Sequence, residues 1–323
     1  MQRATNPESG SFISPQALMA IRNLELRAKI VMEGFWNGLH KSPFHGFSVE
    51  FTEYRDYTPG DDPRFLDWRL FARTDRYYIK KYEDETNLRC HLLVDNSQSM
   101  SYGSIGFSKD QYANTLAATL AYFLHLQGDA TGLLTFDQEI REYLPARHRT
   151  GHLRHLMLAL EKPSRGRSTD LTPPLKRIVE MVRKRGLLIL ISDLFAPITA
   201  LEANLSNLRA CGHEVMLFHV LDPAEVSFNF EQASMFRDLE SGERLYIDPG
   251  AARRDYVAKL RDHTAAVERS CRKLGIGYSR FATDRPLELA LFDFLRVRMQ
   301  RTKQKRTAGH RHQIARHIAT SAA

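Results

Sequence analysis

Apolar and polar residues follow two different patterns along this chain, and the pattern changes near residue 88. Downstream of that point, short runs are almost continuously apolar, which is typical of strands buried on both faces of a parallel sheet. The runs are residues 88–95, 130–136, 187–193 and 213–222. Between them lie stretches of helical periodicity, at residues 109–128, 151–162, 173–186 and 200–212. The alternation predicts an α/β fold, a doubly wound and mostly parallel sheet with helices on both faces.

The C-terminal part of this region continues the pattern after an interruption. Residues 228–248 resemble a hairpin insertion that turns around Ser241-Gly242. A helix at residues 251–275, a strand at 276–282 and a helix at 286–299 are then predicted to close the sheet.

The region before residue 88 has a different character. Residues 15–34 carry apolar side chains at nearly helical spacing, and Gly34 is predicted to end this helix. Residues 47–51 and 77–79 alternate as short strands do. We therefore divide the chain into a disordered N-terminus (1–14), a helix with a small β-rich region that packs on the main domain (15–86), the α/β domain (87–300) and a flexible basic tail (301–323).

Composition favours a cytoplasmic globular protein. Of the 323 residues, 43% are apolar, and no run approaches the roughly 18 consecutive apolar residues of a membrane span. The first residues lack the basic and then apolar layout of a secretory signal. Cys90, Cys211 and Cys271 are far apart and odd in number, so we expect inert, buried thiols rather than disulfides or a zinc site.

The net charge of +8 comes from the last 28 residues, most of which form the tail, and this distribution weakens a nucleic-acid interpretation. Residues 296–323 hold eight Lys or Arg residues and no acidic residue, so the preceding 295 residues are neutral overall. Three interpretations of the tail remain open: a solubilising segment, a contact with an acidic partner or nucleic acid, and metal capture by His310, His312 and His317.

Candidate chemistry gathers where two predicted strands end. The runs 88–95 and 187–193 finish in Asp95 and Asp193, and Ser97 and Ser99 follow Asp95 at alternate positions. Because the carboxyl ends of parallel strands share one edge of a sheet, these residues and Thr169 are expected to converge in an exposed cluster. Carboxylates and hydroxyls form an all-oxygen site that suits Mg²⁺ or Mn²⁺. Such an ion keeps a coordination position for a partner's carboxylate.

These residues resemble a known family pattern. The DxSxS element at Asp95, Ser97 and Ser99, with Thr169 and Asp193, is similar to the metal-ion-dependent adhesion site of von Willebrand factor A domains. The match to the MoxR-associated family called domain of unknown function 58 is narrower and covers most of residues 15–300. It is carried upstream by Tyr54-Arg55-Asp56-Tyr57, Pro59-Gly60-Asp61-Asp62 and Asp67-Trp68.

The resemblance implies a non-enzymatic, chaperone-like adaptor. Its expected partners are a MoxR-type AAA+ ATPase and a client protein that offers a carboxylate to the metal, in the assembly or maturation of a complex. The resemblance makes Ser97, Ser99 and Thr169 direct ligands, and Asp95 and Asp193 ligands directly or through water. Thr172 is the rival of Thr169, which is favoured because Asp170-Leu171 follows it as in the family.

Several other interpretations compete with this one. Asp95 and the serines could simply cap the turn between a strand and a helix. A Mg²⁺-dependent hydrolase of phosphoesters is the alternative function, and a nucleic-acid-associated protein that uses its tail is the second. The chain has no GxSxG elbow for a serine nucleophile and no GxxxxGK[ST] loop, so we expect no direct nucleotide binding. Asp61 and Asp62 fit a turn better than a second acidic site, and Asp137 fits a turn at the sheet edge.

Overall fold

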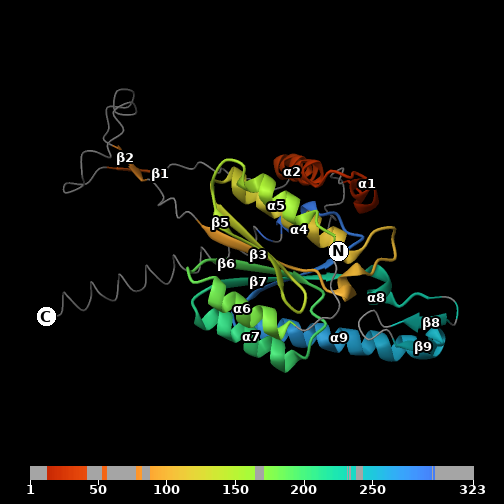
Figure 1. Cartoon of the computed structure of the whole chain (residues 1–323). Coiled ribbons are helices and arrows are strands. Elements are labelled where there is room, and N and C mark those ends of the chain that lie inside the picture. The colour runs from red at the N-terminus through yellow and green to blue at the C-terminus, as the bar shows by residue number, and fades with distance from the viewer. Residues whose placement is uncertain are drawn as a thin grey trace, which may run out of the picture.

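A computed structural model describes the residues that build the α/β domain (Figure 1). The described residues are 13–41, 53–56, 78–81, 88–163, 171–230, 232, 234–237, 243–292 and 294. The predicted tail and most of the predicted N-terminal segment therefore lie outside them, as do residues 47–51, 77 and the loop with Thr169. Upstream of the domain, β1 (Glu53–Asp56) and β2 (Tyr78–Lys81) pair antiparallel, close to the predicted short strands.

A six-stranded sheet forms the centre of the domain, in the order β10-β7-β6-β3-β4-β5. Its strands are β3 (Arg89–Asp95), β4 (Ala130–Phe136), β5 (Ile140–Arg147), β6 (Leu187–Ser192), β7 (Glu214–Leu221) and β10 (Gly277–Ala282). All neighbours pair parallel except β4 and β5, which form an antiparallel pair at one edge. The strand order reverses at β3, the first strand, which lies between β6 and β4. Open sheets of this kind bind ligands outside the carboxyl ends of their strands, next to such a reversal.

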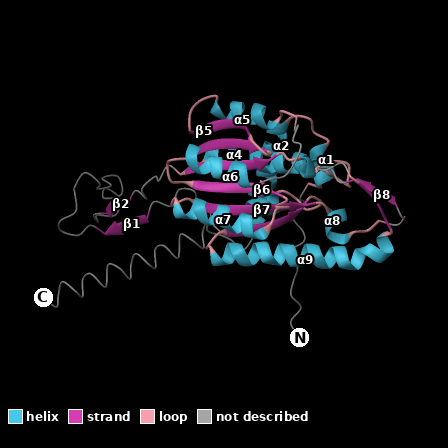
Figure 2. Cartoon of the chain, turned by 60° about the horizontal axis from the view of Figure 1, so that its bottom comes forward, coloured by secondary structure: helices cyan, strands magenta, loops and turns pink. Residues whose placement is uncertain are grey.

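Helices cover both faces of the sheet (Figure 2). One face carries α2 (Leu24–Lys41), α4 (Lys109–Leu126) and α5 (His152–Leu160), and the other carries α6 (Thr172–Met181), α7 (Ile198–Ala210) and α9 (Pro249–Lys273). Alternate strand residues enter the two cores: Leu92 and Val94 of β3 pack on the α4 side, whereas Leu93 packs on the α6 side. This two-sided burial explains the continuous apolar runs. The predicted doubly wound α/β fold is confirmed.

The N-terminal helix differs from its prediction. The structure has a short α1 (Pro15–Met19) and then α2, which begins after Asn23, whose side chain accepts a hydrogen bond from the Leu26 amide at 2.8 Å. Gly34 does not end the helix but lies inside α2. A Cβ at this position would come within 2.9 Å of Glu288 Oε1. Gly34 therefore permits close packing against the C-terminal part of the domain.

Two elements of the structure were not predicted, strand β5 and helix α8 (Pro223–Ser227). Strand β5 mixes charged residues with Pro145, and it forms the sheet edge, where proline is tolerated because one side of the strand needs no hydrogen bonds. Helix α8 is a single turn after β7. Asp137 lies in the turn between β4 and β5, as predicted, and pairs with Arg141 at 2.7 Å. One cysteine expectation was wrong: Cys90 and Cys271 are buried, but Cys211 is exposed at the end of α7.

The predicted insertion contains an antiparallel pair, β8 (Ser234–Arg237) and β9 (Arg244–Ile247). Phe228 anchors it: this buried ring lies 5.8 Å from Phe236 of β8 and 4.5 Å from Tyr256 of α9, between ring centroids. The backbone of Phe228 is left-handed, with φ of 48°, a conformation that costs a bulky residue free energy. The outer part of the pair, including Met235 and Tyr246, is exposed.

Candidate functional site

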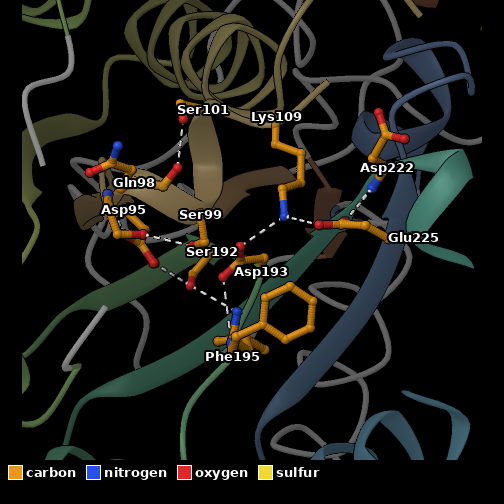
Figure 3. Close-up of polar contacts among 12 residues, drawn as sticks. Asp95, Gln98, Ser99, Ser101, Lys109, Ser192, Asp193, Phe195, Asp222 and Glu225 are labelled. Carbon is orange, nitrogen blue, oxygen red and sulfur yellow. Dashed lines mark hydrogen bonds and ion pairs between the residues drawn. The ribbon is translucent and has the colours of Figure 1, made fainter. Parts of the chain in front are cut away.

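The candidate site lies at the carboxyl ends of β3 and β6 (Figure 3). The two strands pair in parallel, with Val94 opposite Ile191, so the residues that follow them come together at one edge. Asp95 is the last residue of β3. Ser192 is the last residue of β6, and Asp193 follows it directly. Both aspartates are fully buried.

Asp95 is held by neutral donors. Its Oδ1 accepts a hydrogen bond from the Ser97 amide at 2.9 Å, and its Oδ2 accepts one from Ser192 Oγ at 2.5 Å. Burial, together with the negative charge of Asp193, raises the pKa of Asp95 to about 7, although the bonds from Ser192 and Ser97 act in the opposite direction. In the absence of a cation, the Asp95 carboxylate is therefore poorly compensated.

The two serine hydroxyls that follow Asp95 lie next to each other. Ser97 is the N-cap residue of a short 3₁₀ helix, η2 (Gln98–Ser101), but its side chain makes no capping bond. Its Oγ instead shares a hydrogen bond of 3.1 Å with Ser99 Oγ. Adjacent oxygens around an octahedral ion with bonds near 2.1 Å are separated by about 3.0 Å. Ser97 is buried, and Ser99 is half-buried. The spacing of these oxygens fits two neighbouring ligands of one Mg²⁺-sized ion.

Asp193 has a different partner, the ammonium group of Lys109. Lys109 Nζ donates to Asp193 Oδ2 at 2.9 Å and to Glu225 Oε1 at 2.6 Å (Figure 3). Lys109 is the first residue of α4, and Glu225 belongs to α8. Burial acts to lower the pKa of Lys109, but the charges of Asp193 and Glu225 outweigh it, so the pKa is raised. Lys109 is therefore a buried cation inside the site.

The turns around the site are held by further hydrogen bonds. Ser192 Oγ, which donates to Asp95, also accepts from the Leu194 amide at 2.9 Å. Leu194 has a left-handed backbone, with φ of 55°, and its carbonyl lies 3.0 Å from His263 Nε2 of α9. Asp222, after β7, accepts from the amide and hydroxyl of Ser104 at 2.9 and 2.5 Å. The three strand ends are thus joined to the segments that surround them.

The structure brings together four of the five predicted site residues. Asp95, Ser97, Ser99 and Asp193 lie at one edge, whereas Thr169 falls outside the described residues. Its rival, Thr172, is the first residue of α6. The expectation of an exposed cluster was wrong for three members, because Asp95, Ser97 and Asp193 are each 0% exposed.

Sequence reasoning missed Lys109 and Glu225. A lysine at the start of an otherwise apolar helix normally indicates a solvated end, and its partners are 84 and 116 residues away in the chain. Within the described residues, no group of three or more His, Cys, Asp or Glu side chains could hold a metal ion. A cation here would depend on the hydroxyls of Ser97 and Ser99, with Asp95 beside them.

Comparison with known proteins identifies the family. The family described as "Protein of unknown function DUF58" matches residues 53–266. The chain belongs to the DUF58 family. The uncharacterized protein Rv1480 of Mycobacterium tuberculosis is 31% identical to this DUF58 protein over 284 residues, which cover 85% of this chain and 88% of the relative. The match confirms the predicted membership of the family called domain of unknown function 58.

Solved structures resemble this DUF58 protein more distantly. The conserved hypothetical protein BatB from Bacteroides thetaiotaomicron is 16% identical with a TM-score of 0.42, over 66% of this chain and 99% of that one. The SpRpn10 VWA domain is 12% identical with a TM-score of 0.38, over 62% of this chain and 92% of that one. Among the helices described for this chain, none is long and apolar enough to cross a membrane.

Proposed function

We propose that this DUF58 protein is a non-enzymatic interaction module that binds a partner through a divalent cation. The observation that carries the proposal is the 3.1 Å separation of Ser97 Oγ and Ser99 Oγ beside the buried Asp95. Ser97 and Ser99 would be direct ligands, and Asp95 would act directly or through water. Thr169 completes the set in this proposal. The resident ion would be Mg²⁺ or Mn²⁺, which prefer oxygen ligands.

The chemistry of the site favours binding over hydrolysis. Lys109 already engages Asp193, which leaves Asp95, held by the neutral groups of Ser97 and Ser192, as the carboxylate of this pair that is open to an ion. A metal-dependent hydrolase needs groups that position the ion and the attacking water. Hydroxyl ligands are neutral, so the bound ion keeps the positive charge that attracts a carboxylate from outside.

The partners we propose are a MoxR-type AAA+ ATPase and a client protein that presents an Asp or Glu to the ion. Membership of the DUF58 family supports this choice, because the upstream motifs at residues 54–62 resemble those of MoxR-associated members. An ATPase partner places the protein in the cytoplasm, where ATP is available. The adaptor would assist the assembly or maturation of the client.

The cation is tested by calorimetric titration of the full chain with MgCl₂ or MnCl₂. The double variant Ser97→Ala/Ser99→Ala should lose at least about tenfold in affinity, because two direct ligands are removed. Ser101→Ala is the matched control: it removes a hydroxyl from the same 3₁₀ helix, where Ser101 Oγ donates to the Gln98 carbonyl at 2.6 Å, and should bind as wild type does. Equal binding by all three proteins contradicts the site.

The partner is tested by co-purification of the tagged protein with a MoxR-type ATPase in Mg²⁺ or in EDTA. Mg²⁺-dependent capture that the double variant loses is the expected result. Turnover of a phosphoester that depends on metal and is lost in the double variant would replace the proposal with the hydrolase alternative.

A further inference from the structure

Lys109 lies where a positive charge is unfavourable. It is the first residue of α4, and the start of a helix carries a partial positive charge of its own. Its side chain is 0% exposed, so water does not solvate the ammonium group. Three groups surround it instead: the carboxylates of Asp193 and Glu225, and the ring of Phe195, whose centroid is 5.0 Å from Nζ. A buried ammonium group needs such compensation, and two carboxylates compensate the charge of Lys109.

The ammonium group changes the charge that the site offers to a cation. Asp95 and Asp193 are buried at the ends of neighbouring strands, so both carboxylates act on an ion that binds there. Without Lys109, an entering ion would meet two uncompensated carboxylates and would be held tightly. With Lys109 on Asp193 Oδ2, at 2.9 Å, one of the two charges is already matched.

We propose that Lys109 is the internal counter-ion that sets the affinity of this site and its preference for an anionic partner. By neutralising Asp193, Lys109 weakens the hold on the divalent cation and leaves the bound ion with a larger net positive charge. That ion then has more need of an anionic ligand from outside. The inference rests on the proposed cation site and deepens it, because it assigns the regulation of that site to a residue that does not touch the ion.

Charge substitutions at two positions have opposite expected effects. Lys109→Met keeps the length of the side chain and removes the charge, so a divalent cation should bind about tenfold tighter or more. Lys109→Arg keeps the charge and should stay within about threefold of wild type. Glu225→Gln removes the other carboxylate on the ammonium group. Lys109 then acts more strongly on Asp193, and the cation should bind several-fold more weakly.

The experiment is a calorimetric titration with MnCl₂ of the full chain, as wild type and as the three variants. Each protein is first melted in EDTA to establish that it is folded. Tighter binding by Lys109→Met and weaker binding by Glu225→Gln are expected. Binding by Lys109→Met alone also supports the inference, because it shows that the lysine opposes the ion.

Two failures are distinguishable. If wild type binds Mn²⁺ and Lys109→Met binds equally or more weakly, the inference is overturned and the cation site stands. If no protein in the series binds, the cation site and the inference fall together. Should Lys109→Met not fold, Glu225→Gln decides: this carboxylate is partly exposed, with 13% of its side chain accessible, and binding at least as tight as wild type overturns the inference.

Discussion

The ends of β3 and β6 differ in how a buried aspartate is compensated. Each strand leads to an aspartate, Asp95 or Asp193, that is fully buried at the same edge of the sheet. Asp95 receives hydrogen bonds from neutral groups, the Ser97 amide and the Ser192 hydroxyl. Asp193 accepts a bond from the ammonium group of Lys109 at Oδ2, beside a longer one of 3.4 Å from the Phe195 amide at Oδ1. Two aspartates at neighbouring strand ends, one residue apart in register, therefore differ: Asp95 has only neutral donors among these bonds, whereas Asp193 has a charged one.

This difference indicates which of the two strand ends, that of β3 or that of β6, needs an external cation. Hydrogen bonds from neutral groups orient a carboxylate, but they leave most of its charge unmatched in a buried setting. The raised pKa of Asp95, about 7, expresses that deficit. Asp193 is already matched by a residue of the chain. We therefore expect a divalent ion to bind at the β3 end, where the two serine hydroxyls lie, with Asp193 as a neighbour.

The largest expected effect is a difference in the free energy of unfolding between substitutions at the ends of β3 and β6. Asp193→Ala leaves the Lys109 ammonium buried with Glu225 alone and should cost about 3–5 kcal/mol, as for the loss of one partner of a buried pair. Asp95→Ala leaves a hydroxyl and an amide without their acceptor and should cost about 1–3 kcal/mol. Urea unfolding in EDTA measures both. An Asp95→Ala variant that is the less stable of the two would reverse the comparison.

The next effect is the pH dependence that Asp95 contributes at the end of β3. The folded-state pKa of Asp95 is about 7, above its ordinary 3.8, so folding favours the protonated form. This stabilisation is fully present below pH 3.8 and is lost as the pH rises through 7. Wild type should lose stability relative to Asp95→Asn across that window, by at most about 1.4 kcal/mol per pH unit.

Unfolding of both proteins in EDTA between pH 5 and 8 checks it, with those limits chosen as roughly the window of the titration. The buried His91 and His219, whose pKa values burial lowers to about 4, act in the opposite sense. They are present in both proteins, so the difference between the two curves isolates Asp95. A constant difference would contradict the raised pKa.

A smaller loss of stability is expected at Ser192, the β6 residue that donates a hydrogen bond to Asp95 of β3. Ser192→Ala removes the hydroxyl that donates to Asp95 and accepts from Leu194, and should cost about 1 kcal/mol. Because the bond from Ser192 lowers the pKa of Asp95, that pKa should rise further. Carboxyl NMR of labelled protein measures the shift. Ser101→Ala serves as the control, and an unchanged Asp95 titration in Ser192→Ala would contradict the assigned bond.

The last prediction is that the melting temperature does not change when a segment far in sequence from the ends of β3 and β6 is removed. Deletion of residues 301–323 should leave the melting temperature unchanged, because this segment lacks a periodic apolar face that could dock on the domain. A fall of many degrees in differential scanning fluorimetry would show that the tail packs on the domain.

The fold was predictable where one short segment carried its own signal. Strands such as β6 are buried on both faces, so every residue from Leu187 to Ile191 had to be apolar, and the run was visible in the sequence. Strand β5 is half-exposed and contains Pro145, so no simple period marked it. Gly34 was misjudged because its role depends on Glu288, which lies far away in the chain.

The candidate site was predictable for a similar reason, and only in part. The strand-end rule placed Asp95 and Asp193 together, and the DxSxS spacing added Ser97 and Ser99. Lys109 could not be found this way, since its meaning comes from partners on β6 and α8 that only the folded chain brings near. The burial of the aspartates had the same origin: the surrounding turns cover them.

Phe228 limits which substitutions the base of the hairpin can accept. Its left-handed backbone would suit glycine, yet its ring holds Phe236 of β8 against the body of the domain. A glycine here would relax the main chain and free the hairpin, and a different large residue would keep the strain without the ring stacking. Two separate properties of position 228, its backbone conformation and its ring, therefore hold the hairpin in place. Met235 and Tyr246 are exposed, so substitutions there should disturb the fold less than a substitution of Phe228.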